Sequence, residues 1–273
     1  MVVGNGGPAV GGGLRRAARR WRLRRSHGDG GGWWASVGGR GKASVWLGSG
    51  RRWLGGTRDV GSKVRFSSNY DLFRSPAANW RDTLFMEMAP EGPSPEAIPP
   101  PCRGVAEEYA AAVRRLGERL FELLSEALGL PVAYLGRDAG CMDGLSVAAN
   151  NYPPCPEPEA TMGTTRHSEP SFLTVLLQDT SGGLQAVLER PRWRWVDVPP
   201  VAGALVVNVG DLLQLVSNDR LQSVEHRVVA TGGARLYYWC FISGHKSLFA
   251  MCKDDVKDVS LSFFRATLEG NIP

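Results

Sequence analysis

Residues 171–198 of the chain read SFLTVLLQDTSGGLQAVLERPRWRWVDV, and residues 204–242 continue with the same character. Together they contain six short runs rich in β-branched and aromatic residues, bounded by Gly, Pro, Asn and Asp. The runs span residues 171–177, 184–188, 193–198, 204–209, 224–229 and 236–242. No helical pattern separates most of them, so the alternation of strand and helix that a parallel sheet requires is missing. The pattern predicts an antiparallel sandwich, barrel or jelly roll.

A long amphipathic helix is predicted before this β-rich region. Apolar residues recur at helical spacing from Val105 to Leu128. Glu107 and Glu108 fall in the first turn, and Gly129 follows the last apolar residue, as is typical of helix ends. The spacing predicts a helix over residues 103–128.

Composition limits the class of protein. With 273 residues, 43% hydrophobic and 22% charged, the chain can bury one core of its own, and it is neither collagen nor wholly disordered. No apolar stretch is long enough to span a membrane, and the N-terminus lacks the apolar region of a secretory signal. Five widely spaced cysteines without a CxxC pair indicate neither a disulfide framework nor a structural zinc site. We therefore expect a soluble, cytoplasmic protein.

The first 57 residues differ from the rest. They carry 11 of the 32 Lys and Arg residues and one acid, so the net charge of +5 averages a tail of +10 with a body of −5. They also hold 17 of the 34 glycines and five of the nine tryptophans. We expect a disordered extension. The alternatives are an organellar transit peptide and an RNA-binding or membrane-surface segment.

Two histidines in the β-rich region offer a metal site. Residues i and i+2 of a strand face the same side, so His167 and Glu169 can point together, with His226 added from a distant strand. Two imidazoles and a carboxylate leave three open positions on an octahedral Fe(II). Alone, the His-x-Glu pair is a weak signal, because two polar residues on a solvated strand face are commoner.

Three further residues are candidates for binding an anion. Arg235 follows His226 by nine residues, on the next predicted strand, where an inward guanidinium could bind a dicarboxylate with two hydrogen bonds. Its alternative is a surface arginine. Asn150 and Tyr152 place an amide and a phenol on one side of an extended segment, or else belong to a Pro-ordered loop.

Several segments carry a resemblance to a known family. They are NNYPPCPEPEATMGTTRHSEPSFLTVLLQDTSGGLQ (150–185), VDVPPVAGALVVNVGDLLQLVSNDRLQSVEHRVVA (196–230), ARLYYWCF (234–241) and VGSKVRFSSNYDLFRSPAANWRDTLFMEMAP (60–90). The chain resembles the plant 2-oxoglutarate- and Fe(II)-dependent dioxygenases over about residues 58–241. Within them it is most similar to the 1-aminocyclopropane-1-carboxylate oxidase-like group and its relatives that hydroxylate benzoxazinoid glucosides.

The resemblance implies a mainly β fold, a double-stranded β-helix or jelly roll preceded by the long helix. It implies that His167, Glu169 and His226 hold Fe(II), in the positions of the family's HxD...H triad. It also implies that Arg235 and Tyr237, in the positions of the RxS motif, bind 2-oxoglutarate together with Tyr152 and nearby Asn150. No catalytic residue beyond the metal centre is expected, and ascorbate is considered as a further cofactor.

Two of these positions depart from the family pattern. Glu169 stands where the family has aspartate, and its extra methylene is expected to weaken or re-angle metal binding rather than abolish it. Tyr237 stands where the family has serine, and its ring would occupy space that the co-substrate carboxylate needs. The chain also departs from the family before residue 58 and after Phe241, which indicates a truncated or divergent member.

The expected organisation has five parts: the extension 1–57, a remnant of the N-terminal dioxygenase region with a Pro-rich connector (58–102), the helix 103–130, the jelly-roll core 131–245 and a divergent tail 246–273. The expected activity is oxidation, by hydroxylation or demethylation, of a small plant metabolite with dioxygen. The alternative is a catalytically impaired relative that keeps the fold and binds metal or a partner. We expect a monomer that binds neither a membrane nor a nucleic acid. For the expected cytoplasmic localisation, the alternative is targeting to an organelle by the Arg-rich N-terminus.

Overall fold

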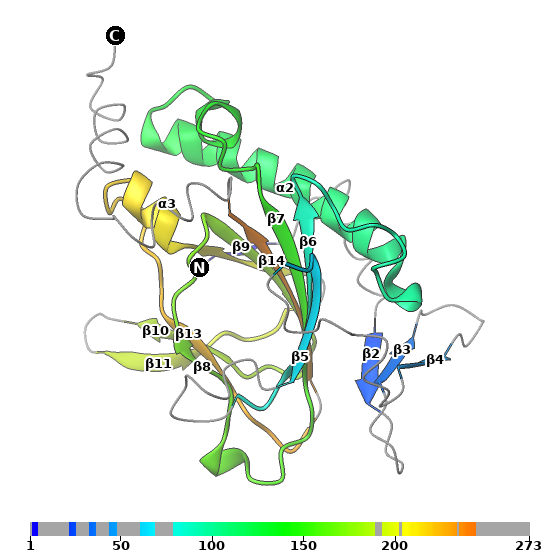
Figure 1. Ribbon diagram of the computed structural model, residues 1–273. Helices are drawn as coiled ribbons and strands as arrows, with labels where there is room; N and C mark the ends of the chain where they lie inside the picture. The colour runs from blue at the N-terminus through cyan, green and yellow to red at the C-terminus, as the bar shows by residue number, and fades with distance from the viewer. Residues whose placement is uncertain are drawn as a thin grey trace.

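The computed structural model shows two antiparallel sheets that face each other, with one long helix outside them (Figure 1). It describes residues 2–4, 22–25, 33–36, 44–47, 61–68, 79–188, 193–201, 204–233 and 235–243. The larger sheet has seven strands in the order β1 (Val2–Gly4), β12 (Leu205–Val209), β9 (Leu173–Gln178), β14 (Arg235–Ile242), β7 (Leu145–Tyr152), β6 (Asp82–Ala89) and β5 (Val64–Ser68). The smaller sheet has four, β11 (Arg194–Asp197), β10 (Leu184–Leu188), β13 (His226–Val229) and β8 (Met162–His167). This is the predicted jelly-roll arrangement.

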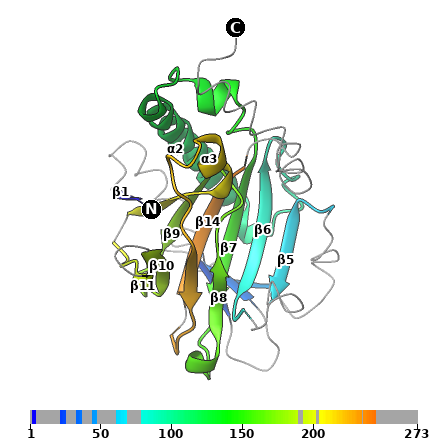
Figure 2. The same ribbon diagram turned by 90° about the vertical axis from the view of Figure 1, so that its left-hand side faces the viewer.

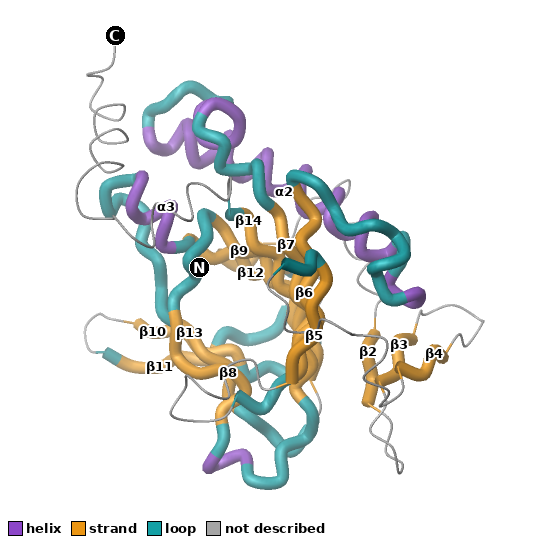
Figure 3. Tube along the Cα trace, viewed as in Figure 1, coloured by secondary structure: helices purple, strands orange, loops and turns teal. Residues whose placement is uncertain are grey.

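Successive residues on the larger sheet face two different cores. Leu145 and Leu173 lie on its outer face and pack with helix α2 (Val105–Leu128), which crosses that face (Figure 3). Leu176 and Val206 lie on its inner face and pack with residues of the smaller sheet. Because α2 shields the outer face, the functional side chains must be sought between the two sheets.

Helix α2 confirms the sequence prediction and begins two residues later than predicted. The chain before it forms the 3-10 turn η1 (Pro100–Cys102), and Gly104 at φ 69° leads into the first turn. Gly129, at φ 79°, ends the helix in the left-handed conformation that favours glycine. Proline and glycine chemistry therefore sets both ends of the helix.

All six predicted β-rich runs form strands, β9 to β14 in chain order. Strand β7 was not predicted as a strand, although it lies at the middle of the larger sheet between β14 and β6 (Figure 2). Seven of its eight residues are buried, so its sequence LSVAANNY shows no alternation of apolar and polar side chains. Its small residues and asparagines also have low β propensity.

The remaining elements are short strands near the N-terminus and one short helix after β12. Strands β2 (Arg22–Arg25), β3 (Trp33–Ser36) and β4 (Ser44–Leu47) form a separate sheet, and β1 pairs with β12. Each is too short for a period to be visible. Helix α3 (Asp211–Val216) begins at Asp211, directly after β12 and Gly210.

Further short turns are η2 (Tyr134–Asp138) and η3 (Pro158–Ala160). The predicted tail 246–273 and the rest of residues 1–57 lie outside the described residues. Among the helices that the structure describes, none is long and apolar enough to cross a membrane.

Candidate metal centre

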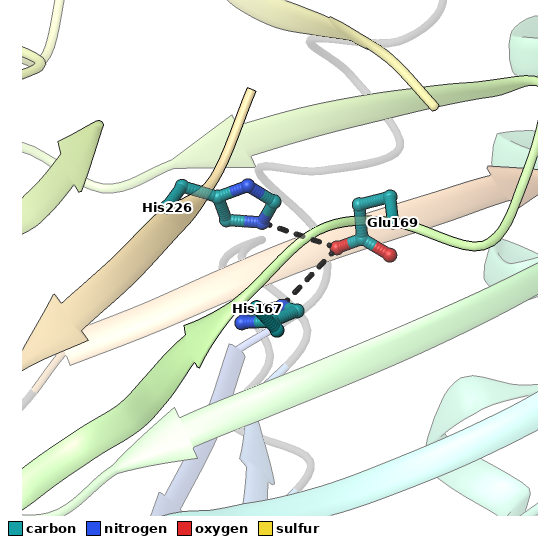
Figure 4. A group of neighbouring side chains, drawn as sticks. All are labelled: His167, Glu169 and His226. Atoms are coloured by element: carbon teal, nitrogen blue, oxygen red, sulfur yellow. Dashed lines mark hydrogen bonds and ion pairs between the residues drawn. The ribbon is translucent and has the colours of Figure 1, made fainter. Parts of the chain in front are cut away.

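The two histidines meet where the smaller sheet's strands β8 and β13 pair. His167 is the last residue of β8, His226 is the first of β13, and the two are partners in the antiparallel register. Their ring centroids are 4.4 Å apart. Glu169 lies in the loop after β8, not on the strand as predicted, because β8 ends at His167. The carboxylate still reaches both rings, as Figure 4 shows.

The spacing of the donor atoms fits one divalent metal ion. Glu169 Oε1 lies 3.2 Å from His226 Nε2 and 3.4 Å from His167 Nε2, and all three ligand atoms lie within 4.8 Å of one another. Donors about 2.1 Å from a metal are about 3.0 Å apart when they occupy neighbouring corners of an octahedron. The two Glu–His separations are close to that value, so small side-chain shifts would place the three donors on one octahedral face.

Backbone carbonyls orient both imidazoles. His167 Nδ1 lies 2.8 Å from the Thr165 carbonyl, and His226 Nδ1 lies 3.1 Å from the Val224 carbonyl. A carbonyl only accepts hydrogen bonds, so each Nδ1 carries the hydrogen and donates it. Nε2, the atom that faces Glu169, is therefore the nitrogen of each ring that is left to bind a metal. This is how metal-binding histidines are commonly held.

Burial and charge prepare Glu169 as an anionic ligand. Its side chain is nearly buried and His226 is fully buried. Burial is the largest single effect on the pKa of Glu169, and it raises that pKa. Hydrogen bonds from His167 and His226, together with the charges of these rings, outweigh burial. The net result is a pKa lowered from 4.5 to about 2. The carboxylate is therefore ionised at neutral pH, and its extra methylene does not prevent contact with either ring.

The residues predicted to bind 2-oxoglutarate lie on adjacent strands of the larger sheet. Arg235 pairs with Tyr152, and Tyr237 pairs with Asn150, in the register between β14 and β7. Tyr237 also pairs with Gln178 of β9. The structure describes the backbone of β14 at Arg235 and Tyr237, and it brings these two positions next to the two predicted partners on β7.

Hydrogen bonds that the sequence did not predict hold Asn150 and Tyr152 in place. The Tyr152 hydroxyl lies 2.9 Å from Thr164 Oγ1 on the facing sheet, and Arg81 Nη1 donates to the same oxygen over 3.0 Å. Thr83 Oγ1 donates to Asn150 Oδ1 over 2.6 Å. Arg81 thus brings a guanidinium to the threonine hydroxyl that Tyr152 also contacts. Spacing along the chain gave no sign of this contact, because Arg81 and Thr164 are 83 positions apart in the sequence.

Comparison with known proteins places this geometry in a family. Residues 144–244 match the model of the 2OG-Fe(II) oxygenase superfamily. The chain is 55% identical over 190 residues to 1-aminocyclopropane-1-carboxylate oxidase homolog 1 of Arabidopsis thaliana, covering 69% of this chain and 51% of that protein. It is 50% identical over 188 residues to the Solanum lycopersicum 1-aminocyclopropane-1-carboxylate oxidase homolog, covering 68% and 51%. The chain therefore spans about half the length of the curated relatives it matches.

Solved structures show the same relationship. JOX2 in complex with 2OG, Fe and JA is 30% identical, with a TM-score of 0.62 over 67% of this chain and 55% of that one. The 2-oxoglutarate complex of AtDAO1, the dioxygenase for auxin oxidation 1 from Arabidopsis thaliana, is 26% identical, with a TM-score of 0.57 over 71% and 72%. Residues 144–244 therefore form a domain of the 2OG-Fe(II) oxygenase type, and the chain is similar to plant members of that superfamily over about half of their length.

Proposed function

We propose that the chain is a 2-oxoglutarate- and Fe(II)-dependent dioxygenase that hydroxylates or demethylates a small plant metabolite. The observation that carries this proposal is the meeting of His167, Glu169 and His226, whose donor atoms lie within 4.8 Å of one another. Two solved relatives bind 2-oxoglutarate, and one of them also binds Fe and JA. The curated relatives at 50–55% identity are plant proteins.

In this proposal His167, Glu169 and His226 hold Fe(II), which when bound supplies sites for 2-oxoglutarate and dioxygen. The protein's own residues prepare that site. The carbonyls of Thr165 and Val224 accept hydrogen bonds from Nδ1 of both imidazoles, which turns Nε2 of each ring toward the metal position. Burial of Glu169 and His226 keeps water away from these two ligands, which strengthens the electrostatic interactions there, whereas His167 is partly exposed.

The co-substrate would lie along β7 and β14. Arg235 and Tyr237 would bind its distal carboxylate, with Tyr152 and Asn150 beside them in register. Arg81 would add a second positive charge next to the Tyr152 hydroxyl, because its guanidinium already contacts Thr164 within that network. A dianionic ligand is best bound where guanidinium groups can donate charge-assisted hydrogen bonds.

The proposed reaction balances without a further reductant. 2-Oxoglutarate loses CO2 and becomes succinate, which takes one atom of dioxygen, and the other atom enters a C–H bond of the substrate to give an alcohol. Hydroxylation of an O-methyl group yields a hemiacetal, which releases formaldehyde and leaves a demethylated product. Ascorbate, if needed, would maintain Fe(II) and is not consumed in this balance.

Succinate formation tests the proposal directly. Incubation of the protein with Fe(II), 2-oxoglutarate and oxygen should yield succinate slowly even without the organic substrate. His226→Ala should lower this rate by more than about 100-fold, because it removes a metal ligand. Glu225→Gln, a neighbouring change at the ion pair with Arg166, serves as the matched control and should retain the rate. Equal rates in the wild type and His226→Ala would refute the proposal.

One observation favours a second candidate function, metal binding without turnover. Tyr237 stands at the position of the expected serine, and the partners predicted beside it, Asn150 and Tyr152, already hydrogen-bond to Thr83 and Thr164. A co-substrate would have to compete with these bonds. Under this alternative the wild type binds metal but makes no succinate, and Tyr237→Ser restores succinate formation. Succinate formation by the wild type would exclude the alternative.

A further inference from the structure

The Glu169 ligand is not held by the strand that carries His167. The hydrogen-bonded pairing of β8 with β13 ends at His167 and His226, and Glu169 lies two residues beyond it. A ligand carboxylate on an unpaired loop would be free to move by more than the about 0.2 Å that metal–ligand bonds tolerate. Some other part of the chain must therefore fix its backbone.

Residues 210–212 provide that fixation. The Asp211 N–H donates to the Glu169 carbonyl over 2.8 Å, and the Gly210 N–H donates to the Phe172 carbonyl over 3.0 Å. The Leu212 N–H donates to the Ser171 carbonyl over 3.2 Å. The segment that follows β12 thus binds the loop at Glu169 and at the residues just after it by backbone hydrogen bonds.

The Asp211 side chain also contacts Ser168, the residue that lies between the ligands His167 and Glu169. Ser168 Oγ, from the residue between His167 and Glu169, donates to Asp211 Oδ2 over 2.9 Å. Asp211 therefore holds two consecutive residues, Ser168 through its carboxylate and Glu169 through its backbone N–H.

Gly210 sets how closely the two segments approach. A Cβ atom at this position would lie 2.0 Å from the Ser171 carbonyl oxygen and 2.9 Å from the Glu169 carbonyl oxygen. Contacts under 3.0 Å are essentially never made by real Cβ atoms, and both neighbours are backbone atoms, so a side chain here would move the loop by about 1 Å. The φ of Gly210 is −96°, which any residue can adopt, so the requirement for glycine is the space alone.

We propose that Gly210 and Asp211 are positioning residues that place the Glu169 carboxylate at the metal, a role that rests on the proposed metal-dependent function. A shift of about 1 Å exceeds the tolerance of a metal–ligand bond several-fold, whereas the two imidazoles stay fixed by the β8–β13 pairing. Enlarging Gly210 should therefore remove the carboxylate from the ligand set while both histidines remain.

Titration of the full chain with Co(II) alone, followed by its visible absorption, tests this role. Gly210→Ala should raise the Co(II) dissociation constant at least tenfold, and the spectrum of its complex should match that of Glu169→Ala rather than that of the wild type. Gly232→Ala is the matched control, because nothing lies within 4 Å of a Cβ there, and it should bind as the wild type does. Far-ultraviolet circular dichroism checks that each variant folds.

The side-chain contact supplies a test that does not depend on Gly210→Ala folding. Asp211→Ala and Ser168→Ala should each weaken Co(II) binding several-fold, and the double variant should weaken it no further, because both remove one hydrogen bond. Asp211→Asn keeps an acceptor oxygen and should largely restore binding. If the folded Gly210, Asp211 and Ser168 variants have the dissociation constants and spectra of the wild type, the positioning role is refuted but the proposed function is not. Absence of Co(II) binding by the wild type would overturn the proposed function as well.

Discussion

Replacing Glu169 by glutamine removes the negative charge from the centre of the site and leaves its shape almost unchanged. Glutamine is a close model of the protonated glutamic acid, so the pKa gives the size of the effect. Each pKa unit corresponds to about 1.4 kcal/mol, and the pKa of Glu169 is lowered from 4.5 to about 2 by His167 and His226 against the effect of burial. The metal-free Glu169→Gln variant should therefore lose about 3 kcal/mol of unfolding free energy at pH 7.

The same reasoning fixes the pH dependence. Because the pKa of Glu169 is depressed in the folded protein, its stabilisation is fully present above about pH 4.5 and disappears as the pH falls toward about 2. The wild type and Glu169→Gln should thus differ by about 3 kcal/mol at pH 7 and converge on acidification. Any divalent metal should add to the difference, since a metal at 100 times its dissociation constant stabilises the wild type by about 2.7 kcal/mol.

Urea unfolding, followed by circular dichroism with chelator and then with Co(II), measures both contributions. Glu225→Gln is the control for the chemical change, because Glu225 pairs with Arg166 at a partly exposed site and should contribute less than about 1 kcal/mol. If Glu169→Gln unfolds at the wild-type urea concentration in chelator and gains as much as the wild type from Co(II), the assigned electrostatics are wrong.

Three further predictions concern stability away from the ligands, each measured by urea unfolding. The Thr174 hydroxyl is fully buried without a partner in the described part of the chain, so Thr174→Val should stabilise the protein by about 1 kcal/mol; destabilisation would contradict this. Ser125 Oγ accepts the Leu135 N–H over 3.2 Å, so Ser125→Ala should cost about 1–2 kcal/mol, and an unchanged midpoint would refute that contact. Arg220 donates to carbonyls in the last turn of α2 over 2.9 and 3.1 Å, so Arg220→Ala should lower the free energy of unfolding by about 1 kcal/mol. An unchanged free energy of unfolding would contradict this.

Elements with a helical period, or with strand-forming residues between turn residues, could be predicted from the sequence, and strand β7 could not. Helix α2 and the strands β9 to β14 were found because their faces differ in polarity or because turn residues bound them. Strand β7 is buried on both faces and rich in alanine and asparagine, so neither its periodicity nor its propensity marks it. The pairing order of the seven-stranded sheet depends on long-range contacts that the sequence pattern does not contain.

The candidate site shows the same division. The ligand types and their residue numbers followed from the resemblance, and the structure brings His167, Glu169 and His226 together. The sequence placed Glu169 on a strand, since i, i+2 alternation was the simplest geometry, whereas a loop held by Asp211 brings it to the histidines. Contacts of this kind join residues more than 40 positions apart. They are set by packing rather than by local spacing.

The measurement that tests the central claim most directly is an anaerobic titration of the purified chain with Fe(II) and then 2-oxoglutarate. A chelated Fe(II)–2-oxoglutarate complex has a visible charge-transfer absorption, which reports metal and co-substrate together. We predict a saturable band that is absent in His226→Ala and retained in Glu225→Gln. A folded wild-type chain that gives no band, or a band that persists in His226→Ala, would contradict the claim that this triad holds the metal to which 2-oxoglutarate binds.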